Sequence, residues 1–174
     1  MALEDSRRKE STDLPGFIRS LALLILALLP ADPLRAAISD GLFSIGTARG
    51  YFQDVMRASL TGRPDTERAA FIVGHGDGSL SCQFWPPMSR YHQEVFHGGL
   101  PPGTVAIVHT HPGDSPRPSA DDQFEADRLG IPIYVLTRRD VYKAEPGQRT
   151  ATAVVISKPW LNDRDPFAGT RCAR

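Results

Sequence analysis

A chain of 174 residues and 19.1 kDa is long enough for one domain with a sizeable hydrophobic core and too short for two. Twenty Lys and Arg residues balance twenty Asp and Glu residues, and neither charge gathers in a long run. The domain is therefore not expected to bind nucleic acid or an anionic membrane surface.

The N-terminal segment, residues 1–36, has the order of an export signal. Basic residues between Arg7 and Arg19 precede an uninterrupted apolar run, Leu21 to Leu29. The run is shorter than the roughly 18 to 20 residues of a spanning helix, and Leu34 and Ala36 occupy the places of a cleavage pair. We expect a signal peptide cleaved after Ala36, or an uncleaved membrane anchor, and hence an exported or anchored protein.

A cytoplasmic protein, with this segment as a buried amphipathic helix, is the alternative. Four acidic residues dilute the positive charge that usually opens a signal peptide: Glu4, Asp5, Glu10 and Asp13. Against a buried helix, every position of the apolar run is apolar, whereas a core helix of a small domain normally keeps one polar side.

The chain has two cysteines, Cys82 and Cys172, which excludes a zinc ribbon and a framework of several disulfides. In an exported protein these residues can form a single bridge that ties down the C-terminus. In a cytosolic protein both thiols are expected to be free and inert.

Hydrophobic spacing predicts the first elements of the domain. A helix is predicted over 50–60, where apolar residues recur at helical spacing before Thr61 to Pro64 end the pattern. A hairpin is predicted over 69–85, because the glycine-rich stretch 74–78 separates two strand-like runs.

Four further strands are predicted at 104–108, 131–137, 141–144 and 151–156. A short helix over 119–129 lies between the first two of these strands. Helices interspersed with short strands indicate an α/β fold, a single-domain sandwich of helices around a mixed sheet.

Two histidines one residue apart, His109 and His111, end the predicted strand 104–108. Residues two apart on a strand face the same side, so both imidazoles project together. Asp122 supplies a third ligand, because the proline-rich loop 112–118 returns the chain and begins a helix that can face the strand end. Three protein ligands leave the fourth position of a zinc ion for water, which is typical of a catalytic site.

These residues resemble the JAMM metalloprotease motif, also called MPN-plus or JAB. The motif reads His-x-His-Pro, six residues, then Ser-x-x-Asp, and the chain matches it from His109 to Asp122 without a gap. Family members also carry a glutamate seven residues before a glycine, and here Glu67 precedes Gly74 by seven. The resemblance extends from about Leu42 to Ile156.

One departure concerns the two residues after Arg68. Relatives often carry Cys-Gly there, whereas this chain has Ala69 and Ala70. We expect the local packing around Glu67 to differ, with no chemical group of the site removed.

The resemblance implies that residues 37–174 form a JAB/MPN domain, an α/β/α sandwich of the cytidine-deaminase-like type. It implies one Zn²⁺ ion held by His109, His111 and Asp122. Glu67 would take a proton from water and pass it to the leaving amine, and Ser119 would donate a hydrogen bond to the developing oxyanion.

The implied activity is zinc-dependent hydrolysis of a peptide or isopeptide bond in a protein or peptide substrate, ubiquitin-like proteins included. For an exported protein, an amide of the cell envelope or the extracellular space is the expected target. The loops around 85–103 are expected to line the substrate groove, and Thr110 has no assigned role.

Two other functions compete with this one. The first is a catalytically silent binding module on the same fold, against which the full ligand set argues. The second is a deaminase-like zinc enzyme, which requires His-x-Glu followed by Pro-Cys-x-x-Cys. His92 to Glu94 supplies the first half by chance, but two distant cysteines cannot supply the second.

Each candidate residue also has a purely structural interpretation. The two histidines can be core residues, Glu67 can be an exposed acid, and Ser119 with Asp122 has the spacing of a capping box. We expect Asp122 to serve the metal rather than the helix cap. The two nearest rival acids, Asp114 and Asp121, are expected to face solvent. The three histidines outside the motif are expected to lie at the surface or in loops: His75, His92 and His97.

Overall fold

The computed structural model describes residues 41–60, 67–86, 98–111, 115–157, 160–161 and 171–174. All of these belong to one compact unit, Leu34–Arg174. The predicted export segment lies outside the described residues, as do His92, His97 and Asp114. Within the described ranges, no helix is both long and apolar enough to cross a membrane.

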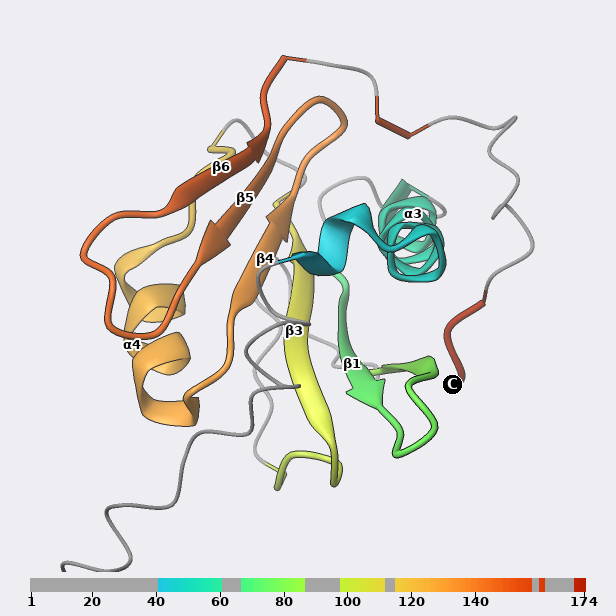
Figure 1. The fold of residues 1–174 in the computed structure, drawn as a ribbon. Helices are drawn as coiled ribbons and strands as arrows, with labels where there is room; N and C mark the ends of the chain where they lie inside the picture. The colour runs from blue at the N-terminus through green and yellow to red at the C-terminus, as the bar shows by residue number, and fades with distance from the viewer. Residues whose placement is uncertain (1–40, 61–66, 87–97, 112–114, 158–159, 162–170) are drawn as a thin grey trace, which may run out of the picture. The chain divides into compact units, whose positions relative to one another are not determined.

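A mixed sheet with the strand order β2-β1-β3-β4-β5-β6 forms the centre of the domain (Figure 1). Its strands are β1 Ala69–Gly74, β2 Leu80–Phe84, β3 Thr104–Thr110, β4 Ile133–Leu136, β5 Val141–Ala144 and β6 Thr152–Val155. Strands β3 and β4 pair in parallel, and the other neighbours pair antiparallel. A parallel pair needs a crossover, and helix α4, Ala120–Leu129, lies within it.

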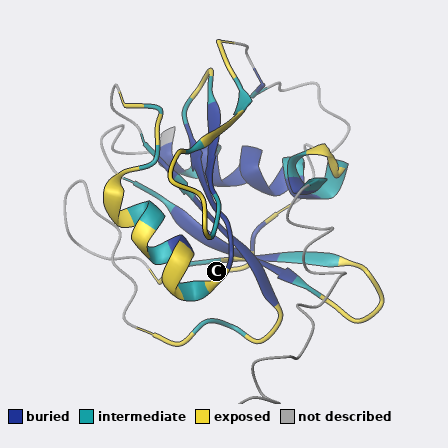
Figure 2. Ribbon diagram, turned by 60° about the vertical axis from the view of Figure 1, so that its left-hand side comes forward, coloured by how far each residue is buried: buried dark blue, intermediate teal, exposed yellow. Residues whose placement is uncertain are grey.

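Two helices cover opposite faces of this sheet, which confirms the predicted α/β/α sandwich. Helix α3, Gly46–Leu60, packs in one hydrophobic cluster with Ile72 and Val108. Helix α4 packs in a second cluster with Phe71 and Ile107. Because side chains alternate along a strand, neighbours such as Phe71 and Ile72 point to different helices. Figure 2 shows α3 deeply buried and α4 with an exposed outer side.

Helix α3 begins at Gly46, four residues before the predicted start at residue 50. Gly46 and Gly50 weaken the helical pattern there, since glycine is a poor helix former. Ala48 is nevertheless fully buried, and it lies four residues before the buried Phe52, on the same side of the helix. A short 3-10 helix, η1 Leu42–Ser44, precedes α3.

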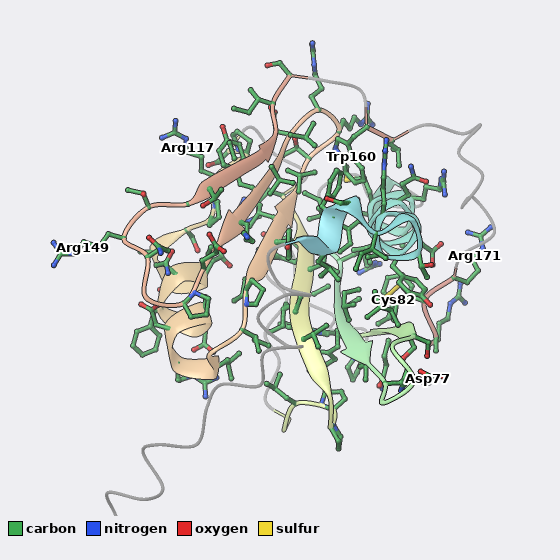
Figure 3. All side chains as sticks on the ribbon, in the orientation of Figure 1. Asp77, Cys82, Arg117, Arg149, Trp160 and Arg171 are labelled. Carbon is green, nitrogen blue, oxygen red and sulfur yellow. A yellow bond between two sulfur atoms is a disulfide. The ribbon has the colours of Figure 1, made fainter. Side chains whose placement is uncertain are left out.

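The C-terminal residues are fixed along the outer edge of β2. A disulfide joins Cys82 to Cys172, which is the single bridge that the sequence left open for an exported protein (Figure 3). The Phe84 amide donates to the Ala173 carbonyl at 2.8 Å, and the Ala173 amide donates to the Cys82 carbonyl at 2.8 Å. The tail therefore covers backbone groups that an edge strand would leave open.

Candidate metal centre

The two histidines of the motif stand at the end of β3. His109 lies within the strand and His111 just after it, with the ring centroids 4.9 Å apart and the rings nearly perpendicular. Ile107 belongs to the cluster on the α4 side of the sheet. His109 and His111 follow at intervals of two, so both imidazoles face the side that carries α4.

Glu67 reaches the same place from the neighbouring strand. Strand β1 starts two residues later, at Ala69, which is paired with His109. One ligand atom from each of Glu67, His109 and His111 lies within 4.8 Å of the others, and the three residues are partly buried. This group can hold a metal ion.

Asp122 approaches the same imidazoles from the first turn of α4. Its Oδ1 lies 3.0 Å from Nε2 of His109, and its Oδ2 lies 4.0 Å from Nε2 of His111. Asp122 therefore lies beside both imidazoles at the end of β3, whereas the group whose ligand atoms all lie within 4.8 Å of one another consists of Glu67, His109 and His111.

Asp122 also caps α4, so the expectation that it would not serve the helix cap was wrong, while its role as a metal ligand stays a prediction. Its Oδ2 accepts hydrogen bonds from the Ser119 amide at 2.6 Å and the Ser119 hydroxyl at 2.8 Å. Its own amide donates to Ser119 Oγ at 3.1 Å, which completes a capping box. A carboxylate has two oxygens with separate lone pairs, so Oδ2 closes the cap while Oδ1 faces His109.

The ring nitrogens of the histidines fit a metal ion. Nε2 of His109 is buried and has no hydrogen-bond partner among the described residues, although Asp122 Oδ1 is 3.0 Å away. Buried polar atoms are rarely left without a partner, and a cation held between Nε2 of His109 and Oδ1 of Asp122 would satisfy both atoms.

A hydrogen bond at the other ring nitrogen of His111, Nδ1, leaves Nε2 available for a metal ion. Nδ1 of His111 lies 2.9 Å from the carbonyl oxygen of Ser115. A carbonyl can only accept, so Nδ1 donates the hydrogen bond and, in the neutral imidazole, Nε2 keeps its lone pair. Such a partner fixes the tautomer and orientation of metal-binding histidines in many proteins.

The charge of Asp122 suits a cation. Burial raises the pKa of its carboxyl, but contact with His109 and the hydrogen bonds from Ser119 outweigh burial and lower the pKa to about 2. Asp122 is therefore ionised at neutral pH, as a metal ligand must be.

The other candidates from the sequence lie where they were expected or fall outside the described residues. Ser119 is the N-cap residue of α4, joined to the site through Asp122. Asp121 is exposed. His75 is exposed after the far end of β1, where its Nε2 lies 2.8 Å from Ser81 Oγ.

Two positioning contacts were missing from the sequence interpretation. The Ser115 carbonyl is a main-chain group, so no residue pattern could have indicated it. Thr110 was left without a role, yet it is fully buried and bonded to Arg68 through both its amide and its hydroxyl. In the sequence, its place between two candidate metal ligands was the only indication that Thr110 has a role at the site.

Part of the chain matches a known protein family. Residues 51–153, more than half of the chain, match the family described as prokaryotic homologs of the JAB domain. The matched part contains Glu67, the two histidines, Asp122 and the N-cap serine. No curated protein and no solved structure gives a significant match.

Proposed function

The chain belongs to the family of prokaryotic homologues of the JAB domain, and on that premise we propose that it is a zinc-dependent hydrolase of amide bonds. The substrate class is a protein or peptide, with a peptide or isopeptide bond cleaved. One observation carries the proposal, namely that Glu67, His109 and His111 bring ligand atoms within 4.8 Å of one another.

His109, His111 and Asp122 would hold the zinc ion. Asp122 is assigned as the third ligand because its Oδ1 touches His109 at 3.0 Å while its Oδ2 is held by Ser119. When bound, zinc polarises a carbonyl and lowers the pKa of water, which makes hydrolysis possible without a protein nucleophile.

Glu67 is then assigned as the general acid and base. A carboxylate beside the metal ligands can accept a proton from water and deliver it to the leaving amine. The Ser119 hydroxyl donates to Asp122 Oδ2 at 2.8 Å. Rotation about its Cβ–Oγ bond would redirect this hydrogen to an oxyanion, a contact that typically contributes about 10² or more to rate.

We further propose that the protein works outside the cytosol. The Cys82–Cys172 disulfide supports this location, because disulfides persist mainly in oxidising compartments. The basic and apolar N-terminal segment agrees with it. An amide of the cell envelope or the extracellular space is then the proposed target.

Zinc analysis of the purified full chain, combined with hydrolysis assays, tests the proposed function. The assays should cover a fluorogenic peptide library and isopeptide-linked ubiquitin-like substrates. We expect one zinc per chain and hydrolysis in the wild type, loss of zinc in His109→Ala, and retention of zinc without hydrolysis in Glu67→Gln. His75→Ala is the matched control, since His75 is exposed and lies outside the motif.

The outcomes separate the hypotheses. A wild-type protein that binds zinc but hydrolyses none of these substrates would favour the silent binding module. A wild-type protein without zinc would refute both the hydrolase and its metal site.

A further inference from the structure

We propose that Thr110 is a positioning residue whose hydroxyl holds the main chain at Arg68 and thereby directs Glu67 toward the two imidazoles. The inference rests on the proposed function of Glu67. Thr110 lies between His109 and His111, but its side chain points away from them, because alternate residues of a strand face opposite sides.

The contacts of Thr110 are unusual for a strand pair. The Thr110 amide donates to the Arg68 carbonyl at 2.9 Å, and the Arg68 amide donates to Thr110 Oγ1 at 3.0 Å. In a regular antiparallel ladder the second bond would go to a backbone carbonyl. Here a side chain extends the pairing of β1 and β3 one residue beyond Ala69 and His109.

This contact acts on Glu67 through a single peptide plane. The Arg68 amide and the Glu67 carbonyl belong to the same planar peptide unit. Fixing the direction of this amide therefore fixes the backbone to which the Glu67 side chain is attached. Thr110 is fully buried, so water does not readily replace its hydroxyl as the acceptor.

The β3 strand provides a matched control for this contact. Thr104 lies at the other end of β3, is 3% exposed, and donates its hydroxyl to the Pro101 carbonyl at 2.6 Å. Replacing either threonine by valine removes one buried hydroxyl of the same strand. Of these two hydroxyls, the Thr110 hydroxyl accepts from the peptide unit of Glu67, whose carbonyl also accepts from the Arg68 guanidinium at 3.3 Å.

The experiment compares Thr110→Val, Thr110→Ser and Thr104→Val by hydrogen exchange, zinc content and hydrolysis per folded molecule. We expect Thr110→Val to keep one zinc and to lose protection of the Arg68 amide. Its hydrolysis should fall by up to about 100-fold, since a displacement of about 1 Å can cost that much. Thr110→Ser should behave as the wild type, and Thr104→Val should leave both the Arg68 amide and the rate unchanged.

A rate of hydrolysis in Thr110→Val equal to that of the wild type, at equal zinc content, would overturn the inference. Unchanged protection of the Arg68 amide in a folded Thr110→Val protein would overturn it as well.

Hydrogen exchange at the Arg68 amide can be measured whether or not the protein is an active hydrolase. Loss of Arg68 protection in Thr110→Ser, which keeps the acceptor, would overturn the inference whether or not the valine variant folds. Absence of zinc from the wild type would instead refute the proposed function while leaving the exchange result to decide the hydroxyl contact.

Discussion

Oδ1 of Asp122 lies 3.0 Å from Nε2 of His109, and this contact joins the first turn of α4 to the end of β3. The other oxygen of the same carboxylate closes the capping box of the helix. The third residue of the helix is thus also the proposed metal ligand, so the helix cap and the proposed metal site share one side chain.

Replacing Asp122 by asparagine should weaken zinc binding strongly. The loss should exceed the roughly 10- to 100-fold effect typical of outer-shell partners, because a charged direct ligand is removed. Competition with a chelating dye measures the affinity. Asp121→Asn is the control, since this exposed residue also lies in the first turn of α4. Equal affinity in the two variants would refute Asp122 as a ligand.

Acid should destabilise the zinc-free protein through the same residue. The pKa of Asp122 is lowered in the folded protein to about 2, from 3.8. A carboxyl whose pKa is lower in the folded than in the unfolded protein stabilises the fold at pH values above its unfolded pKa. This contribution is lost as the pH falls through its folded pKa. Near pH 5, the free energy of unfolding of the zinc-free wild type should therefore exceed that of zinc-free Asp122→Asn by roughly 2 kcal/mol.

Urea unfolding at several pH values measures this difference. The gap between wild type and variant should close as the pH falls from about 4 toward 2. A gap that stays constant over this range would show that the Asp122 contacts do not depend on its charge.

The disulfide should contribute strongly to stability. Cys82 and Cys172 are separated by 90 residues in sequence, and closing a loop of that size stabilises by about 4.6 kcal/mol in the chain-entropy description. Urea unfolding of the double serine variant should show this loss. Reductant should cause a similar loss in the wild type and none in the variant; equal stability of both proteins would contradict the prediction.

Asp54 should hold the C-terminal tail together with the disulfide. It is buried, and its carboxylate accepts from the Cys172 amide and from the Arg171 guanidinium, both at 2.8 Å. Asp54→Ala should lower the free energy of unfolding by about 1–3 kcal/mol, because a buried donor loses its partner. Arg171→Ala should cost less than about 1 kcal/mol, since the arginine side chain is 68% exposed.

A thermodynamic cycle tests this assignment. With both cysteines replaced, the Asp54→Ala effect should shrink, because both groups act on the same tail. Full additivity, or an equal loss in Arg171→Ala, would mean that the Cys172 amide contact contributes little.

The positions of the strands and the common face of the two histidines could be predicted from the sequence, because both depend on local patterns. Strand β5 was predicted with its observed bounds, and the spacing of two placed His109 and His111 on one face. The start of α3 was missed because two glycines interrupt an otherwise helical spacing.

Contacts between distant residues were less accessible from the sequence. The bond from Arg68 to Thr110 spans 42 residues and depends on the register of β1 with β3. The double role of Asp122 depends on where its two oxygens point, which spacing cannot give. The cysteine pair was a prediction only for an exported chain, because pairing depends on compartment as well as distance.

X-ray absorption at the zinc edge of the zinc-loaded full chain tests the central claim most directly. We predict two imidazole nitrogens and carboxylate or water oxygens at about 2.0–2.2 Å, with no sulfur. His109→Ala should lose this pattern, and His75→Ala should keep it. A spectrum without two imidazoles, or the same spectrum in His109→Ala, would contradict the account.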